Sequence, residues 1–145
     1  MAEALQARVQ QLGVDADVVF HGLVHDPIPL LRACRIFVLP SRFEGTPNAL
    51  LEAMAHRLAC IVSDASPGPL QLIVDGVTGR VVQTDRVDSL AEALGQLAGN
   101  SSLQRSLGEA AFQRVQEFSL DRVSKVWDHI LFPDESTQVV SASHV

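Results

Sequence analysis

The chain has 145 residues, of which 47% are hydrophobic and 19% are charged, so it is long enough and apolar enough to fold around one core. Eleven basic residues against seventeen acidic ones give a net charge of −6, which argues against a protein that binds a nucleic-acid backbone. No apolar run approaches the ~20 residues that span a bilayer, and the first residues lack a signal-peptide pattern. We therefore expect a cytoplasmic domain with no nucleic-acid partner and no transmembrane segment. Cys34 and Cys60 lie in apolar stretches, which predicts two buried thiols and no disulfide.

Apolar periodicity and turn residues predict alternating helices and short strands. In chain order they predict a helix over 2–12, a strand over 17–21, a short helix through Leu31 that Asp26 and Pro27 begin, a strand over 35–39, a helix from Asn48 to about His56, a strand over 59–63, a helix over 69–74, a strand over 79–82, and three helices over 87–98, 101–117 and 119–131. Residues 133–145 are small and polar and are expected to form a flexible tail.

Strands that alternate with helices indicate an α/β fold with a parallel sheet of about four strands. The strands are nearly continuous apolar runs, as expected when helices cover both faces of the sheet. Ligands of such sheets bind beyond the carboxyl ends of the strands. Those ends fall here at His21-Gly22, at 40–44, at 63–68 and at Val82.

The most informative segment is PSRFEGTPNALLEAMA, residues 40–55, in which a loop joins a strand to a helix. Thr46 followed by Pro47 predicts a helix N-cap with proline at the first helical position. The free amides of Asn48, Ala49 and Leu50 would then offer a site for a phosphate or sugar oxygen. Gly45 would let a ligand approach the backbone closely.

Two glutamates in this segment have alternative interpretations. Glu52 lies on the polar face of the predicted helix, where most glutamates are simply solvated, although a glutamate at this end of a sheet could accept hydrogen bonds from sugar hydroxyls. Glu44 could stabilise the helix dipole without taking part in any reaction. The spacing alone does not choose between these interpretations.

The same residues resemble a known family. Glu44 and Glu52, seven residues apart in PSRFEGTPNALLEAMA, match the E-x7-E signature of family 4 retaining glycosyltransferases. The likeness continues in VVFHG (18–22), IFVLPS (36–41), CIVSD (60–64), Gly68-Pro69 and DGVTGRVV (75–82). It spans roughly residues 2–131.

The resemblance implies the GT-B fold, in which two Rossmann-like domains face a cleft and the C-terminal one holds a nucleotide-sugar without a metal ion or other cofactor. Residues 1–132 would then be a donor-binding Rossmann-like domain that lacks its first two strands. The implied reaction is sugar transfer with retention of anomeric configuration, from a donor that is most often a UDP-sugar.

By resemblance, Glu44 is the catalytic residue and lies against the donor sugar, whereas Glu52 contacts the nucleotide ribose. The other donor-binding positions carried over are Gly22, Ser41, Arg42, Gly45, Thr46, Asn48 and Ala49. A solvated loop arginine is the more common role for a residue placed like Arg42.

Three departures from the family pattern bear on this assignment. Arg57 and Ala59 stand where the family usually has glycine and proline, and an arginine at a left-handed helix end costs ~1 kcal/mol relative to glycine. Gln71 stands where a glutamate is frequent. The basic pair that grips the diphosphate, and the acceptor domain with its catalytic histidine, have no counterpart, so none of the five histidines takes that role.

Two functions follow. The chain is either the donor half of a retaining glycosyltransferase, with a partner chain supplying the acceptor domain, or a non-catalytic remnant or binding module with weak nucleotide-sugar affinity. Without the first two strands, we expect the strand near 18–20 either to pair with the strand at 36–39 or to be held only by its helix.

Overall fold

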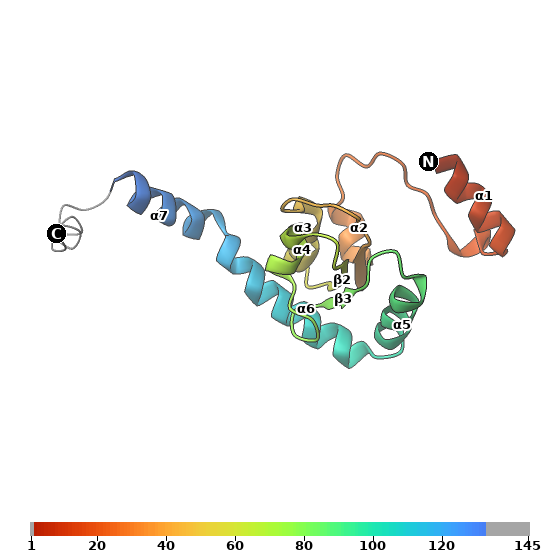
Figure 1. Cartoon of the computed structure of the whole chain (residues 1–145). Coiled ribbons are helices and arrows are strands. Elements are labelled where there is room, and N and C mark those ends of the chain that lie inside the picture. The colour runs from red at the N-terminus through yellow and green to blue at the C-terminus, as the bar shows by residue number, and fades with distance from the viewer. Residues whose placement is uncertain (1, 133–145) are drawn as a thin grey trace, which may run out of the picture.

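The computed structural model describes residues 2–132, which form helices around one small sheet (Figure 1). In chain order the elements are α1 (Ala2–Leu12), the 3₁₀ helix η1 (Asp15–Asp17), α2 (Ile28–Ala33), β1 (Ile36–Leu39), α3 (Asn48–Ala55), β2 (Ala59–Ser63), α4 (Pro67–Leu72), β3 (Arg80–Val82), α5 (Val87–Ala98), α6 (Ser101–Val115), η2 (Gln116–Phe118) and α7 (Leu120–Leu131). The predicted tail, 133–145, lies outside the described residues.

The sheet is parallel throughout, with strand order β1-β2-β3. Ile36 pairs with Ala59 at the start of β1, and Ser63 pairs with Val82 at the end of β2. Helices α3 and α4 make the two crossovers, which is the arrangement that parallel strands require. The predicted α/β fold is confirmed, with a sheet of three strands in place of about four.

Both faces of the sheet are covered, so β2 is buried at all five positions. Cys60 and Val62 face α2, α3 and α4, whereas Ala59 and Ile61 face α5. Helix α6 contributes to both layers, with Ala111 in the first and Leu107 in the second. This alternation follows from the two-residue period of a strand.

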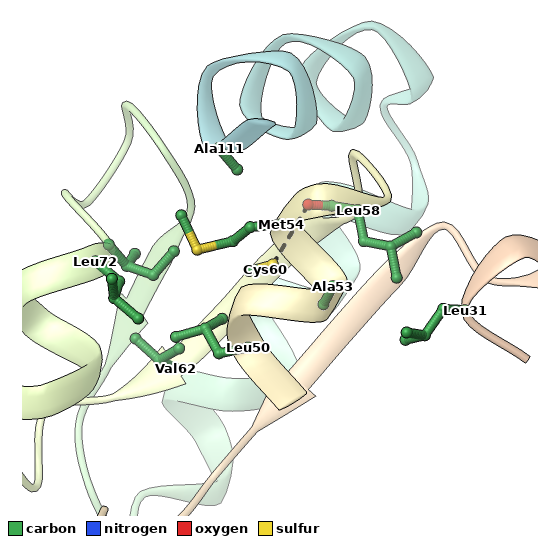
Figure 2. Close-up of a cluster of buried hydrophobic side chains, with 10 residues drawn as sticks. Leu31, Leu50, Ala53, Met54, Leu58, Cys60, Val62, Leu72 and Ala111 are labelled. Carbon is green, nitrogen blue, oxygen red and sulfur yellow. Dashed lines mark hydrogen bonds between the residues drawn. The ribbon is translucent and has the colours of Figure 1, made fainter. Parts of the chain in front are cut away.

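The first layer packs around Leu50 and Met54 of α3, both fully buried (Figure 2). The Cys60 thiol lies within it and donates to the Leu58 carbonyl at 3.4 Å. Burial raises the pKa of this thiol to about 12. The predicted burial of Cys60 is confirmed, but that of Cys34 is wrong, because Cys34 follows α2 at the surface.

The predicted strand at 17–21 is also wrong. Residues 18–21 form no strand and do not pair with β1, and Val19 is 72% exposed. This segment lies against α1, where Val18 and Phe20 line a small pocket with Val9. Its β-branched sequence favours extended backbone, but a strand forms only when a neighbour accepts its hydrogen bonds. The segment therefore does not pair with the strand at 36–39 and lies against α1, the second of the two expected alternatives. Helix α1 itself lies apart from the sheet (Figure 1).

Helix α3 ends in a Schellman motif, in which the Leu58 amide donates to Ala53 and the Arg57 amide donates to Met54. Arg57 takes the left-handed conformation, with φ of +58°. The predicted left-handed position is therefore confirmed. Gly108 of α6 packs directly on this turn, so that a Cβ atom at Gly108 would overlap the Arg57 carbonyl oxygen.

The three C-terminal helices agree with their predicted ranges, α6 ending slightly early in the short helix η2. The Asn100 side chain caps α6 by accepting from the Leu103 amide at 2.9 Å. Helix α7 has no buried residue and runs away from the sheet (Figure 1). Among residues 2–132, no helix combines the length and hydrophobicity needed to cross a membrane.

The contact between Gly108 and the Arg57 turn should be required for stability. We expect Gly108→Ala to lower the free energy of unfolding by about 1–3 kcal/mol, because the added methyl must push α6 away from α3. The matched control is Gly95→Ala in α5, where no atom lies within 4 Å of the new Cβ. That control should raise the free energy of unfolding by about 0.5–1 kcal/mol. Urea denaturation followed by circular dichroism measures both, and equal effects would contradict the packing role of Gly108.

Candidate functional site

The three strands end at one edge of the sheet, where three loops meet. A pocket of about 370 Å³ opens at this carboxyl edge. The residues that line it are Pro40, Arg42, Ser63, Val82, Gln83, Thr84, Asp85, Arg86, Val87 and Leu90. Ligands of parallel sheets bind at this edge, so the pocket and the neighbouring loop 41–46 form the candidate site.

Hydrogen bonds hold the loop 41–46 against the sheet. The Ser41 hydroxyl donates to Glu44 Oε1 at 2.7 Å, and the Glu44 amide donates to Ser66 Oγ at 3.0 Å. The Ser63 hydroxyl, at the end of β2, donates to the Ser41 carbonyl. Ser41 and Glu44 are thus brought together, and the Glu44 carboxylate is fixed through one oxygen. Glu44 Oε2 takes part in no hydrogen bond within residues 2–132.

The backbone of Gly68 lies directly against the backbone of Gly45 in the same loop. A Cβ atom at Gly68 would overlap the Gly45 carbonyl, so only glycine fits at this position. Gly68 is buried at the start of α4, which begins two residues earlier than predicted. Gly45 itself is exposed and has open space around it.

Helix α3 begins one residue later than predicted, so the assignment of Thr46 as its N-cap is wrong. Pro47 is the N-cap, with φ of −79° and ψ of 110°, and no side chain caps the helix. Because Pro47 itself has extended backbone, it stays outside the helix, and Thr46 lies one residue further from it. Thr46 is exposed.

The start of α3 offers two free amides in place of the predicted three. The Leu50 amide donates to the Pro47 carbonyl at 3.0 Å, so the prediction that it is free is wrong. Asn48 and Ala49 are exposed residues, and their amides donate to no acceptor in the described part of the chain. Together with the positive end of the helix dipole they can receive an anionic or hydroxyl oxygen.

Glu52 lies on the second turn of α3, exposed on the side away from the core. Its carboxylate accepts no hydrogen bond from residues 2–132. Its backbone carbonyl is 2.9 Å from Nδ1 of His56, one turn further along. The carboxylate is therefore accessible to a ligand, as a solvated glutamate would also be.

The arginines at the carboxyl edge are neutralised locally. Arg42 Nε lies 2.8 Å from Asp85 Oδ1, and both side chains are largely exposed. Arg86 makes two hydrogen bonds to Asp88, at 3.0 and 2.6 Å. Positive charge available for a diphosphate is consequently limited at this edge.

The loop 83–86 is the part of the site that sequence reasoning missed. The Asp64 carboxylate holds it by accepting from the Thr84 amide at 2.8 Å and from the Thr84 hydroxyl at 2.6 Å. These hydrogen bonds, the hydroxyl first, hold the pKa of Asp64 below 3.8. The available signal was the position of the loop directly after β3, at a strand end already expected to face a ligand.

Two other positions singled out in the sequence make no hydrogen bond to this cluster within the described chain. Gly22 is in the segment before α2, with φ of +64°, and shares no hydrogen bond with the other predicted site residues in the described chain. Gln71 uses its backbone carbonyl to accept from the Arg114 guanidinium at 3.0 Å. No group of three or more His, Cys, Asp or Glu side chains that could hold a metal ion is found among residues 2–132.

Comparisons with known proteins agree with this architecture. Residues 1–100 match the family model described as Glycosyl transferases group 1. A lipopolysaccharide core biosynthesis mannosyltransferase of Rhizobium leguminosarum bv. viciae is 36% identical over 122 residues, covering 83% of this chain and 34% of that protein. An exopolysaccharide phosphotransferase of Streptomyces coelicolor is 32% identical over 127 residues, covering 87% of this chain and 14% of that protein.

Two solved structures share the fold. The C-terminal domain of a glycosyl transferase group 1 family protein from Francisella tularensis superposes with a TM-score of 0.74 at 30% identity, covering 82% of this chain and 63% of that chain. Anabaena HepE in complex with UDP superposes with a TM-score of 0.84 at 20% identity, covering 90% of this chain and 36% of that chain. The chain spans about a third or less of the length of the two curated relatives named above.

The hydrogen bonds from Thr84 make a specific pH dependence measurable at this edge. Because the folded pKa of Asp64 is below the unfolded one, its contribution to stability is full above pH 3.8 and is lost as the pH falls through the folded value. We expect Thr84→Val to raise the pKa of Asp64 toward 3.8, because the hydroxyl that the substitution removes is the largest cause of the lowered pKa. Carbon-detected NMR titration of the carboxyl groups measures it. Asp88, whose pKa is lowered by Arg86, serves as the internal control and should not move. An unchanged pKa of Asp64 would contradict this assignment.

Proposed function

The chain belongs to the glycosyl transferases group 1 family, and on that premise we propose that it forms most of the nucleotide-sugar-binding half of a retaining glycosyltransferase. The observation that carries the proposal is the anchored loop 41–46, which fixes the Glu44 carboxylate beside the start of α3 at the ligand edge of the sheet. The full enzyme would transfer a sugar from a nucleotide-sugar to an acceptor with retention of configuration.

The two glutamates have complementary surroundings for this role. Glu44 is half-buried and accepts a hydrogen bond from Ser41 through one oxygen, which leaves its other oxygen to accept a hydrogen bond from the donor sugar. Glu52 is exposed and can accept hydrogen bonds from ribose hydroxyls. Hydrogen bonds to a charged group are worth about 1.5–3 kcal/mol, which makes both carboxylates effective for orientation.

Backbone amides would supply the donors that face the glutamates. The N–H groups of Asn48 and Ala49 at the start of α3 donate to no acceptor in the described chain, and Gly45 leaves room for a ligand to approach. Such groups can hold sugar hydroxyls or a diphosphate oxygen and stabilise the charge that develops on the departing diphosphate. Ser41 and Thr46 border the same loop, whereas Arg42 would need to leave Asp85 to contact a phosphate.

We propose a UDP-sugar as the donor. The support is that Anabaena HepE, which shares the fold, binds UDP in its crystal structure. Most of the curated relatives' length lies outside this chain, so we also propose that the acceptor domain is supplied by other sequence or by a partner chain.

A binding role without turnover is the second candidate. It is favoured by the pairing of Arg42 with Asp85 and of Arg86 with Asp88, which leaves the carboxyl edge with little free positive charge for a diphosphate. A weak nucleotide-sugar site on an inactive module would have this character. Release of UDP from UDP-glucose, measured with the chain together with the sequence that supplies the acceptor domain, separates the two functions.

Calorimetric titration with UDP, GDP, ADP and their glucose conjugates tests the donor site. We expect UDP or UDP-glucose to bind and Glu52→Ala to weaken that binding by about 10–100-fold, because hydrogen bonds to the ribose are lost. The matched control is Glu92→Ala, which removes an exposed glutamate from the middle of α5 and should leave the affinity unchanged. No binding of any nucleotide, or equal binding to wild type and Glu52→Ala, would overturn the proposal.

A further inference from the structure

A second pocket lies at the opposite, amino edge of the sheet, where no role has yet been assigned. It has a volume of about 370 Å³ and is bordered by the residues that precede β1 and β2 together with the first turns of α6. Its lining residues are Cys34, Arg35, His56, Arg57, Leu58, Ser101, Gln104 and Arg105. Strand β2 separates it from the carboxyl-edge pocket by roughly 15 Å, at about 3.3 Å per residue.

The charge of this amino-edge pocket is opposite to that of the whole chain. Three of its eight lining residues are arginines and none is an aspartate or glutamate, although the chain carries a net charge of −6. Arg35 and Arg105 form no ion pair within residues 2–132. By contrast, Arg42 and Arg86 at the carboxyl edge are both paired with aspartates.

The third arginine is held rigidly at the rim of the pocket. Arg57 Nε donates to Glu109 at 2.9 Å, and its guanidinium lies 3.6 Å from the centre of the Phe112 ring. The left-handed backbone of Arg57 and the contact with Gly108 fix the main chain beneath it. A guanidinium that is already ordered loses little entropy when its remaining N–H groups bind an anion.

We infer that the amino-edge pocket binds a phosphoryl group, as a phosphate monoester or a diphosphate, at a site separate from the proposed donor site. Arg35 and Arg105 supply positive charge that no carboxylate within residues 2–132 pairs with, and Arg57, whose Nε donates to Glu109, offers its terminal N–H groups to phosphate oxygens. The Ser101 hydroxyl adds a neutral donor at the wall of the pocket. The source of the group is either a soluble phosphate compound or the head group of an anionic phospholipid.

The chain carries its own reporter for this site. Cys34 is exposed in the wall of the pocket, whereas Cys60 is buried and its pKa is raised to about 12. At pH 8 a thiol reagent should therefore modify Cys34 and leave Cys60 unmodified. The rate of Cys34 alkylation thus measures occupancy at the amino edge and is insensitive to ligands at the carboxyl edge.

Alkylation of Cys34 in the full chain with inorganic pyrophosphate present is the decisive measurement. We expect pyrophosphate to slow the reaction, with chloride at matched ionic strength having no such effect. Arg35→Gln and Arg105→Gln should each weaken this protection by about tenfold, since each removes a charge-assisted contact. Both side chains are exposed and unpaired with carboxylates in the described chain, so neither substitution should impair folding.

Two further variants separate a local site from general electrostatics. Arg57→Gly removes the guanidinium while suiting the left-handed backbone, and it should also weaken protection. Arg42→Gln removes the same charge at the carboxyl edge and should leave protection unchanged. Absence of protection in wild type, or equal loss in Arg42→Gln and Arg35→Gln, would overturn the inference. Because the readout is confined to the amino edge, its failure is distinct from failure of the proposed donor site.

Vesicles distinguish the two sources of the phosphoryl group. Sedimentation with phosphatidylglycerol vesicles that pyrophosphate reverses, and that Arg35→Gln weakens, would identify a lipid head group. Protection of Cys34 by pyrophosphate without sedimentation would identify a soluble ligand. Sedimentation that survives Arg35→Gln and Arg105→Gln together would count against the pocket as the lipid site.

Discussion

Burial of β2 on both faces is the constraint on which the rest of the structure depends. All five of its residues are buried, so each face needs a helical layer, as is typical of a parallel sheet. Cys60 and Val62 face the α2–α3–α4 layer and Ile61 faces α5. Since α6 packs across both layers, any shift of α6 would open the core on both faces. The tight contact of Gly108 with the Arg57 turn fixes its position.

The same strand positions the candidate site at its carboxyl end. Ser63 closes β2 and bonds to the Ser41 carbonyl, and the buried Gly68 leaves room only for the Gly45 backbone above it. The loop that carries Glu44 is therefore supported from the core as well as by its own Ser41–Glu44 hydrogen bond. Asp64 extends this support to the third loop through Thr84. A rigid support of this kind is what precise placement of a carboxylate beside a ligand requires.

The two edges of the sheet differ in their electrostatics. At the carboxyl edge Arg42 and Arg86 each have an aspartate within hydrogen-bond distance. At the amino edge Arg35 and Arg105 lack such partners in the described chain. The pairing follows from loop geometry, because Asp85 and Asp88 come from the segment after β3, which reaches only the carboxyl edge.

The sequence by itself determined the parallel α/β fold, the three strands of the sheet, the C-terminal helices and the family. Apolar runs, helical periodicity and the segment around Glu44 are patterns of residues close together in the chain, so the sequence alone shows them. It predicted a strand at 17–21 and a Thr46 cap that the structure lacks. A strand depends on a neighbour to accept its hydrogen bonds, and the extended backbone of Pro47 places the start of α3 one residue later. Only the tertiary structure decided that Arg42 pairs with Asp85 and which loops meet, because those contacts join residues far apart in the chain.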